Sequence, residues 1–451
     1  MPSTSRTKRN ARDRPHSRAI VLYGRSLIAL VVAHSLSKQG VEVFAADDVE
    51  LTVTSFSRHV SRTFVHAPVA GDRERFLSDL EEKIIRHKPD EGVPYVLIPV
   101  FNETEIIAEN RERFERHIRV AAPPIEAIRM VHPKHKLWVT AEKLGLRIPR
   151  TWTSDDVEDM LRAAATVACP CVVKPRDGIG GRGFRVVKTR SELQRLLKGD
   201  ASAGKVLPLV QELVSGDDFC LSVLAEHGSI KAAMAYRNLR RFPAEGGAGV
   251  VRETVAEQPF LTDARTLCEY TRWHGIMQLD FIWSGNPEEA PVLIEVNARF
   301  WLGLFQSVQS GVDFPWLLFQ LFAAGHIDSV MTPRIGTRTK IPGLWLMGAI
   351  QDIASNESAF ERLRRAWMSV RESAADRTTR DRMDQVMDTA SKTRDRRETF
   401  GLLRTIVQEA RTAKNDIFYR DDPFIALGVM FILASLIRHR RLPPEIRQNQ
   451  K

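Results

Sequence analysis

Three polar residues stand inside two strongly apolar runs of the sequence. Asp280 lies in QLDFIW, and Glu295 and Asn297 lie in LIEVNARF. Each run predicts a β-strand, and residues two apart on a strand point to the same face, so Asp280 could join the other two from a neighbouring strand. Buried carboxylates are costly unless they are paired or bound to a metal. Three oxygen ligands suit Mg²⁺ beside a nucleotide, and structural salt bridges are the alternative.

Arg299 follows Asn297 by two residues and is expected on the same strand face. Its guanidinium could balance the charge of a transferring phosphoryl group and of an acyl intermediate. The alternative is that Arg299 neutralises Glu295, and the two roles are compatible. The pattern therefore predicts a catalytic arginine beside the metal ligands.

Lys174 ends the strand-like run VVK and precedes a glycine-rich segment, RDGIGGRGF, at residues 176–184. Glycines allow the backbone to approach a ligand closely, and their N–H groups can point at phosphate oxygens. The segment lacks the G-K-[ST] ending of a Walker loop, and a plain β-turn is the alternative. We expect a triphosphate to be held by Lys174 and by the loop glycines Gly178, Gly180, Gly181 and Gly183. Lys136, on a predicted helix, is a second phosphate-binding candidate, and a solvated lysine is the alternative there.

A third group could hold the base and the sugar of a nucleotide. Gln211, Glu212, Leu213 and Val214 end a predicted strand, and Asp218 follows them. A carboxylate and backbone groups at a strand end could bond the amino group of adenine, and Asp218 could accept from the ribose hydroxyls. The alternative is a solvated loop.

An α/β domain is predicted over residues 19–125, before the elements that carry these residues. Residues 19–23 (AIVLY) and 41–46 (VEVFAA) predict strands around a helical pattern that ends at Gly40. A right-handed crossover would make the two strands parallel. Only Gly24 follows the first strand, so a dinucleotide site is not expected there. We expect this domain to be mainly structural and to supply one wall of a substrate cleft.

Residues 126–325 predict a second, α+β domain with several antiparallel strands, and residues 326–451 predict a helical C-terminal region. Residues 423–437 (PFIALGVMFILASLI), followed by the basic residues up to 441, would span about 22 Å as a helix, which is short for a membrane. A buried helix is expected, and a peripheral membrane contact through residues 423–441 is the alternative.

Composition sets the class of protein. Of the 451 residues, 43% are hydrophobic and 27% are charged, as in globular proteins. The net charge is +10, but residues 1–18 hold six cations and one acid, so we expect a basic disordered tail and no nucleic-acid partner. The four cysteines lack zinc-type spacing, and Cys169 and Cys171 are interpreted as packing residues. A reducing, cytoplasmic location is expected, with membrane association as the alternative, and a homo-oligomer is open.

The motifs together resemble the ATP-grasp superfamily, in family order and spacing, over residues 19–325. The resemblance rests on the lysine and glycine loop at 174–184, on QELV at 211–214, on DFI at 280–282 and on IEVNARF at 294–300. Residues 56–58 (FSR) and 97–99 (LIP) look like the N-terminal domain found near carbamoyl phosphate synthetase large subunits. Residues 135–138 (HKLW) are similar to the lysine motif that opens the central domains.

The resemblance implies roles for these residues. Lys136 and Lys174 would hold ATP phosphates, Glu212 and Val214 adenine, and Asp218 ribose, although many relatives carry Glu at that position. Asp280, Glu295 and Asn297 would ligate Mg²⁺, with Mn²⁺ as a second candidate, and Arg299 would lie beside the γ-phosphate. In the family an arginine near a glycine loop meets the carboxylate substrate. Arg237 is our candidate among Arg237, Arg240 and Arg241, and a surface patch is the alternative.

The family's usual reaction implies the function. We expect an ATP-dependent carboxylate–amine ligase that forms an amide or peptide-like bond through an acylphosphate, with small-molecule acid and amine substrates. A phosphotransferase or carboxylase of the same family and a non-catalytic ATP-binding module are the alternatives. The fold class implied is an α/β N-terminal domain, an α+β ATP-grasp domain and a helical C-terminal extension.

Overall fold

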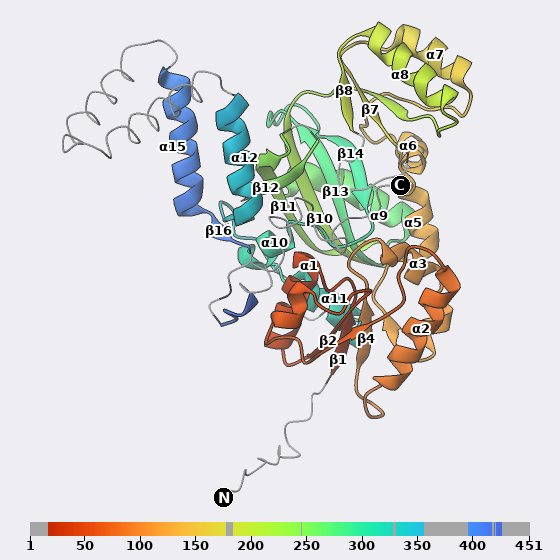
Figure 1. Cartoon of the computed structure of the whole chain (residues 1–451), viewed down its shortest axis with the longest axis vertical. Coiled ribbons are helices and arrows are strands. Elements are labelled where there is room, and N and C mark those ends of the chain that lie inside the picture. The colour runs from red at the N-terminus through yellow and green to blue at the C-terminus, as the bar shows by residue number, and fades with distance from the viewer. Residues whose placement is uncertain are drawn as a thin grey trace, which may run out of the picture.

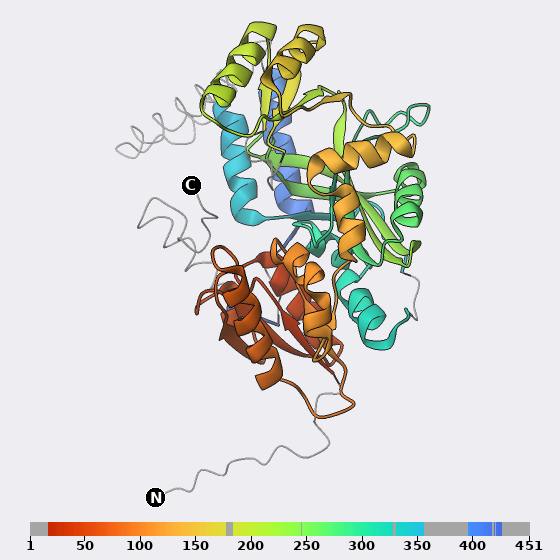
Figure 2. The same cartoon turned by 90° about the vertical axis from the view of Figure 1, so that its right-hand side faces the viewer.

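The computed structural model describes residues 17–176, 184–244, 246–327, 331–355, 396–416, 419 and 421–425. Two views at right angles show an N-terminal α/β domain at one end of the molecule and a small body with two helices at the other (Figures 1 and 2). A large sheet lies between them (Figure 1). The large sheet is therefore flanked on one side by the N-terminal domain and on the other by the small body.

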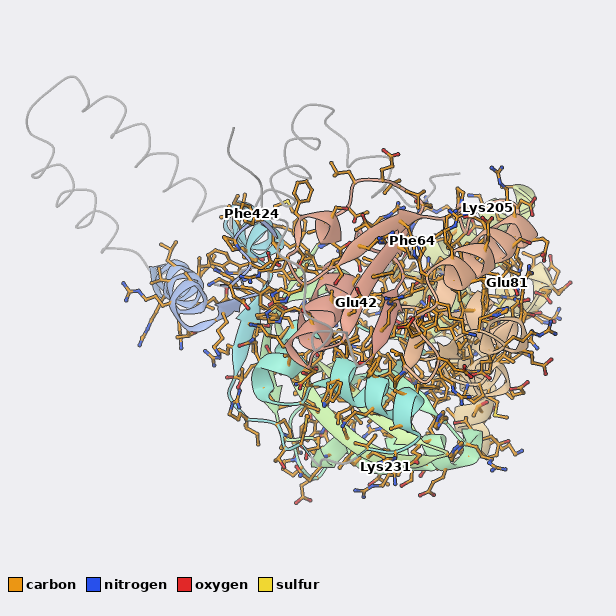
Figure 3. All side chains as sticks on the ribbon, turned by 90° about the horizontal axis from the view of Figure 1, so that it is seen from below. Glu42, Phe64, Glu81, Lys205, Lys231 and Phe424 are labelled. Atoms are coloured by element: carbon orange, nitrogen blue, oxygen red, sulfur yellow. The ribbon has the colours of Figure 1, made fainter. Side chains whose placement is uncertain are left out.

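The N-terminal domain is built on five parallel strands in the order β3-β2-β1-β4-β5. The strands are β1 (Arg18–Val21), β2 (Glu42–Asp47), β3 (Arg62–Val65), β4 (Tyr95–Ile98) and β5 (Arg119–Val120). The helical elements are α1 (Leu27–Lys38), η1 (Val53–Phe56), α2 (Arg73–Arg86), α3 (Glu103–Glu109) and α4 (Arg111–Glu115). The predicted parallel pairing of the first two strands is confirmed. Figure 3 views this domain from below, with Glu42 of β2, Phe64 of β3 and Glu81 of α2 labelled.

The sequence around the first helix explains its bounds. The Ser26 side chain accepts a hydrogen bond from the backbone N–H of Ala29 at 3.0 Å and so caps the start of α1. Gly40 follows the helix with φ +81°, a left-handed conformation that costs glycine little. The helix therefore ends where the sequence predicts.

Two helices lead from the N-terminal domain to the small body. They are α5 (Ile125–Val131) and α6 (Lys134–Lys143). The small body has a four-stranded sheet in the order β6-β9-β7-β8 and two helices. Its elements are β6 (Thr151–Trp152), α7 (Val157–Thr166), β7 (Cys171–Lys174), β8 (Arg185–Val187), α8 (Arg190–Ser202) and β9 (Leu209–Glu212). It has its own apolar core, in which Cys171 is fully buried as a packing residue.

The large sheet has seven strands in the order β14-β13-β10-β11-β12-β15-β16. They are β10 (Asp217–Glu226), β11 (Ser229–Phe242), β12 (Ala248–Val255), β13 (Gly275–Trp283), β14 (Val292–Asn297), β15 (Arg338–Lys340) and β16 (Lys414–Asn415). The accompanying helices are α9 (Gln258–Thr271), α10 (Leu304–Ser310) and α11 (Phe314–Ala324). Buried Leu317 and Leu318 of α11 share one core with α1 and with β10, so the sheet and the N-terminal domain are packed together.

The described part of the C-terminal region contains α12 (Pro342–Ser355) and α15 (Arg396–Thr412), as well as strands β15 and β16. The strands extend the large sheet, which the prediction of a helical region did not include. Buried Arg252 of β12 bonds Asp416 at 2.8 Å, and buried Arg240 of β11 pairs with Glu409 of α15 at 3.0 Å. These buried ion pairs tie the region to the sheet.

The last described segment, residues 421–425, reaches the N-terminal domain. Asp422 accepts hydrogen bonds from the Ser57 hydroxyl and from the backbone N–H of Arg58. Ile425 is buried against α1 and η1, whereas Phe424 is exposed. Most of the apolar stretch at 423–441 lies outside the described residues. Among the helices that are described, none has the length and apolarity to cross a membrane.

Candidate active site

The two acid-bearing strands place their polar residues side by side. Asp280 of β13 is directly opposite Glu295 of β14, and Gln278 is opposite Asn297, in an antiparallel pair. Asn297 Nδ2 lies 3.4 Å from Asp280 Oδ2. The structure thus brings Asp280, Glu295 and Asn297 together on one face, because alternation along each strand and the register between them agree.

The environment of Asp280 is unfavourable for an ionised carboxylate. Its Oδ1 is buried and has no hydrogen-bond partner among the residues that the structure describes. Burial and the nearby carboxylates of Glu295 and Asp218 raise the pKa of Asp280 to about 7. An unsatisfied buried oxygen beside a second carboxylate is stabilised by a cation, so this donor set fits a hard divalent metal.

Two lysines face these acids from the other side. Lys134 Nζ, at the first residue of α6, lies 3.3 Å from Glu295 Oε1, and its side chain is only 14% exposed. Lys174 Nζ lies 5.7 Å from the centre of the Trp138 ring. Burial lowers the pKa of Lys174 to about 8, and Glu295 opposes the shift while Lys134 adds to it. The site therefore places two ammonium groups opposite the acids, and the phosphates of a nucleotide could contact both ammonium groups.

Lys134 is a site residue that the sequence analysis missed. The predicted Lys136 lies on the exposed face of α6, because positions two apart on a helix point in nearly opposite directions. The signal was available: Lys134 precedes buried Leu137, Trp138 and Ala141 at helical spacing, whereas Val139 is 64% exposed. Lys134 and not Lys136 thus belongs to the buried face of this helix.

Arg299 lies where the large sheet meets the N-terminal domain. Its Nη2 donates to Asn297 Oδ1 at 3.1 Å, and its guanidinium carbon lies 4.9 Å from the centre of the Phe101 ring. Burial lowers the pKa of Arg299, and the carboxylates of Glu295, Asp280 and Glu103 oppose that shift. A planar cation held this way remains charged and is fixed in orientation beside the acids.

A cavity of about 230 Å³ opens next to Arg299. Its lining comes from both domains: Phe101, Asn102, Thr104, Glu105, Ile128, His132 and residues 295–299. His132 Nδ1 lies 3.0 Å from a Glu105 carboxylate oxygen, at one wall. The N-terminal domain therefore contributes one wall of a cleft beside the acids, as the sequence analysis expected.

Arg237 is not near this group. Its guanidinium pairs with Asp217 at 2.6 Å and lies 6.0 Å from the Phe219 ring, on the face of β10 opposite to Asp218. Arg241 instead donates from Nε to Asp218 Oδ2 at 2.7 Å. The register between β11 and β12 is irregular at residues 238–241, and Arg241 lies on the site face, whereas regular alternation would place it on the same face as Arg237.

Asp218 is on the site face but its carboxylate is already engaged. Besides Arg241, Asn238 Nδ2 donates to the same oxygen at 2.8 Å. Asp218 is also one of the carboxylates that raise the pKa of Asp280. In this structure Asp218 therefore anchors Arg241, and a contact with ribose would require its other oxygen or a shift of the arginine.

The proposed adenine segment lies at the end of β9. Gln211 is buried and donates from Nε2 to Thr151 Oγ1 at 2.8 Å, so its side chain is structural. Glu212 and Leu213 are exposed and Val214 is half-buried, which leaves them accessible to a base. The glycines Gly178, Gly180, Gly181 and Gly183 lie outside the described residues.

The segment of the chain that carries these site residues is similar to known proteins. Residues 132–302 match the family model for the ATP-grasp domain. A formate-dependent phosphoribosylglycinamide formyltransferase from Actinobacillus pleuropneumoniae serotype 3 (strain JL03) is 27% identical over 201 residues, which are 43% of this chain and 47% of that protein. The carbamoyl phosphate synthase large chain of Thermotoga neapolitana is 25% identical over 128 residues, 28% of this chain and 11% of that one.

The fold extends the comparison beyond the matched segment. The crystal structure of an L-amino acid ligase from Bacillus licheniformis superposes with a TM-score of 0.55 at 15% identity, covering 73% of this chain and 80% of that one. The chain spans about half the length, or less, of the curated relatives just described. The sequence match covers α6, the strands of both sheets that carry site residues, and Arg299, so residues 132–302 of this chain are an ATP-grasp domain.

Proposed function

We propose that this chain is an ATP-dependent ligase that joins a carboxylate to an amine. One observation supports the proposal most strongly. Two carboxylates and an amide on β13 and β14 face lysines from α6 and β7, and Arg299 lies beside them. ATP would lie between the four-stranded and seven-stranded sheets, with its phosphates at the lysines and its base at residues 212–214.

Asp280, Glu295 and Asn297 would hold Mg²⁺, or Mn²⁺ in its place. The partnerless Asp280 Oδ1 and its neighbouring carboxylate support this assignment. When bound, the cation supplies Lewis-acid stabilisation of charge on the transferring phosphoryl group, worth roughly several kcal/mol. The remaining work belongs to the protein's own cations and to its positioning of the reactants.

The reaction has two displacements. An oxygen of the substrate carboxylate attacks the γ-phosphorus of ATP, the bond to the β–γ bridging oxygen breaks, and ADP leaves. The amine nitrogen then attacks the carbonyl carbon of the acylphosphate, inorganic phosphate leaves with the C–O bond electrons, and the amine loses a proton to solvent. Lys134 and Lys174 would hold phosphate oxygens, and Arg299 would balance the charge that develops at the carboxyl group.

The cavity beside Arg299 supports a small acid as the substrate. Its volume of about 230 Å³ is below the usual range for drug-sized ligands. Arg299 presents a fixed guanidinium fork at its wall, which suits a carboxylate. Both observations favour a compact carboxylic acid that approaches from the side of the N-terminal domain.

The test is ADP release from Mg-ATP by the full chain, with pooled carboxylic acids and pooled amines. We expect release that requires one acid pool and one amine pool, and a product that contains a new amide. A phosphorylated or carboxylated product would replace the ligase assignment with other ATP-grasp chemistry. No release in any pool, with ATP still bound, would favour a binding module.

A matched pair of variants tests the site itself. Lys134→Met should lose most ADP release, whereas Lys136→Met, two residues away on the exposed face of the same helix, should keep it. The reverse result would restore Lys136 as the phosphate ligand. Equal activity in both variants would remove α6 from the site.

A further inference from the structure

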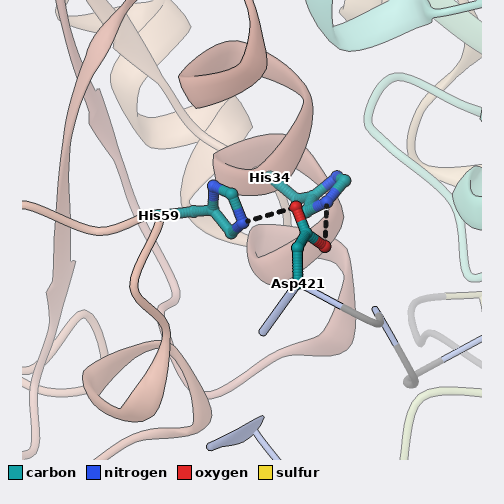
Figure 4. Close-up of side chains that lie close together, drawn as sticks. All are labelled: His34, His59 and Asp421. Atoms are coloured by element: carbon teal, nitrogen blue, oxygen red, sulfur yellow. Dashed lines mark ion pairs between the residues drawn. The ribbon is translucent and has the colours of Figure 1, made fainter. Parts of the chain in front are cut away.

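A second cluster of potential metal ligands shares no residue with the nucleotide site. His34 of α1, His59 just after η1 and Asp421 of the C-terminal segment meet on the N-terminal domain (Figure 4). His34 Nε2 lies 3.5 Å from Asp421 Oδ1, and His59 Nε2 lies 3.5 Å from Asp421 Oδ2. All three donor atoms lie within 4.8 Å of one another.

The contacts between the histidines and Asp421 are longer than ordinary hydrogen bonds. The Nε2 atoms of both histidines are buried and have no close hydrogen-bond partner among the described residues. A separation of 3.5 Å is long for a hydrogen bond. It is close to the separation of about 3.3 Å between two ligands of a tetrahedral ion with bonds of about 2.0–2.1 Å. The spacing thus leaves the three side chains close enough to share one ion.

The surroundings hold the two rings in position for such an ion. His59 is 7% exposed, and its Nδ1 lies 3.1 Å from Ser37 Oγ, so the other ring nitrogen is directed at Asp421. His34 stacks on Tyr419 with ring centres 3.7 Å apart and meets His59 edge to face at 4.6 Å. An outer hydrogen bond that fixes ring orientation is usual for a metal-binding histidine.

One cation already approaches the cluster. The Lys38 ammonium pairs with Asp421 Oδ2, and the Lys38 side chain is 51% exposed. Because this side chain can leave to solvent without a large cost, it would compete with a metal ion and would not block it. A metal ion would take over the charge balance of Asp421.

We propose that His34, His59 and Asp421 form a binding site for a divalent transition metal of the zinc class. Two imidazole nitrogens and one carboxylate favour such an ion over Mg²⁺ or Ca²⁺, which prefer oxygen ligands alone. Since Asp421 comes from the C-terminal segment and the histidines from the N-terminal domain, the ion would fasten residues 421–425 to that domain. Asp422, bonded to Ser57 and Arg58, would then be the neighbouring half of the same attachment.

The experiment uses the full chain, stripped with a chelator and titrated with zinc alone in excess Mg²⁺, so that the nucleotide site is saturated. We expect one zinc per chain by chelator competition, and a visible d–d absorption band after replacement by Co²⁺. Asp421→Asn should weaken zinc binding by at least about 10-fold. His66→Gln, a buried histidine of the same domain outside the cluster, should bind zinc as the unaltered chain does.

Lys38→Gln separates a metal site from a purely structural cluster of ion pairs. Removal of the competing ammonium should tighten zinc binding, whereas a structural cluster would only lose stability. No stoichiometric zinc in the unaltered chain would overturn the proposal. Equal zinc affinity in Asp421→Asn and the unaltered chain would do so as well, and circular dichroism of each variant confirms that it is folded.

Discussion

The nucleotide site and the histidine cluster are assembled in opposite ways. Asp280, Glu295 and Asn297 come from two adjacent strands within 18 residues of one another, and strand alternation together with the register of this pair puts them on one face. The residues His34, His59 and Asp421 are brought together only when the C-terminal segment returns to the N-terminal domain. The first site depends on local pairing and the second on long-range packing, so different substitutions should disable each.

The largest effect is expected for Glu295→Gln. This change keeps the shape of the side chain but removes the charge that faces Asp280 and Lys134. Turnover in the ADP-release assay should fall by about 1000-fold or more, because metal and phosphate stabilisation are lost together. Glu288→Gln, on the exposed loop between the same two strands, is the control and should keep full activity. Substantial activity in Glu295→Gln would exclude it as a metal ligand.

A second expected effect is on the attachment of the C-terminal region to the large sheet. Arg252→Met leaves the buried Asp416 carboxylate without its partner, and the free energy of unfolding should fall by about 3 kcal/mol in urea denaturation. Arg338→Met on the neighbouring strand removes an ion pair with Glu253 whose side chains are 27% and 24% exposed. That control should cost about 0–1 kcal/mol. Equal losses would mean that burial does not distinguish the two pairs.

Metal binding at the nucleotide site should depend on pH. The pKa of Asp280 is about 7 in the folded chain and about 3.9 in the unfolded chain, so the metal-free fold binds this proton more tightly. The resulting contribution to stability is fully present below about pH 4 and is lost as the pH rises through about 7. Mg²⁺ requires the ionised form, so its affinity should rise about tenfold per pH unit below pH 7 and level off above it. Calorimetric titration of the full chain measures this slope. The same slope in Asp280→Asn would assign it to another group.

The smallest effect is expected where the C-terminal segment meets the N-terminal domain. Asp422→Ala removes the hydrogen bonds from Ser57 and Arg58 and should lower global stability by about 1 kcal/mol or less. Limited proteolysis should nevertheless cut the segment after residue 416 faster than in the unaltered chain. Zinc should slow this cleavage if the histidine cluster binds it. Cleavage that neither Asp422→Ala nor zinc alters would separate the segment from both attachments.

Much of the fold could be predicted because its signals are local. Apolar runs and helical spacing indicated the parallel start of the N-terminal domain and the antiparallel strands that carry the acids. The strands β15 and β16 were not predicted, since runs of three and two residues have no periodicity of their own and exist only as additions to a sheet edge.

The residue types in the sequence are enough to predict a nucleotide-binding set. Strand alternation, which is a property of the chain alone, is enough to put Glu295 and Asn297 on one face. The choice among chemically equivalent neighbours depends instead on how the elements pack and pair in three dimensions. Packing of one face of α6 selected Lys134 over Lys136, and irregular pairing of β11 turned Arg241 instead of Arg237 to the site. The return of Asp421 to two distant histidines has no local signal, because its contacts join residues that are far apart in the chain.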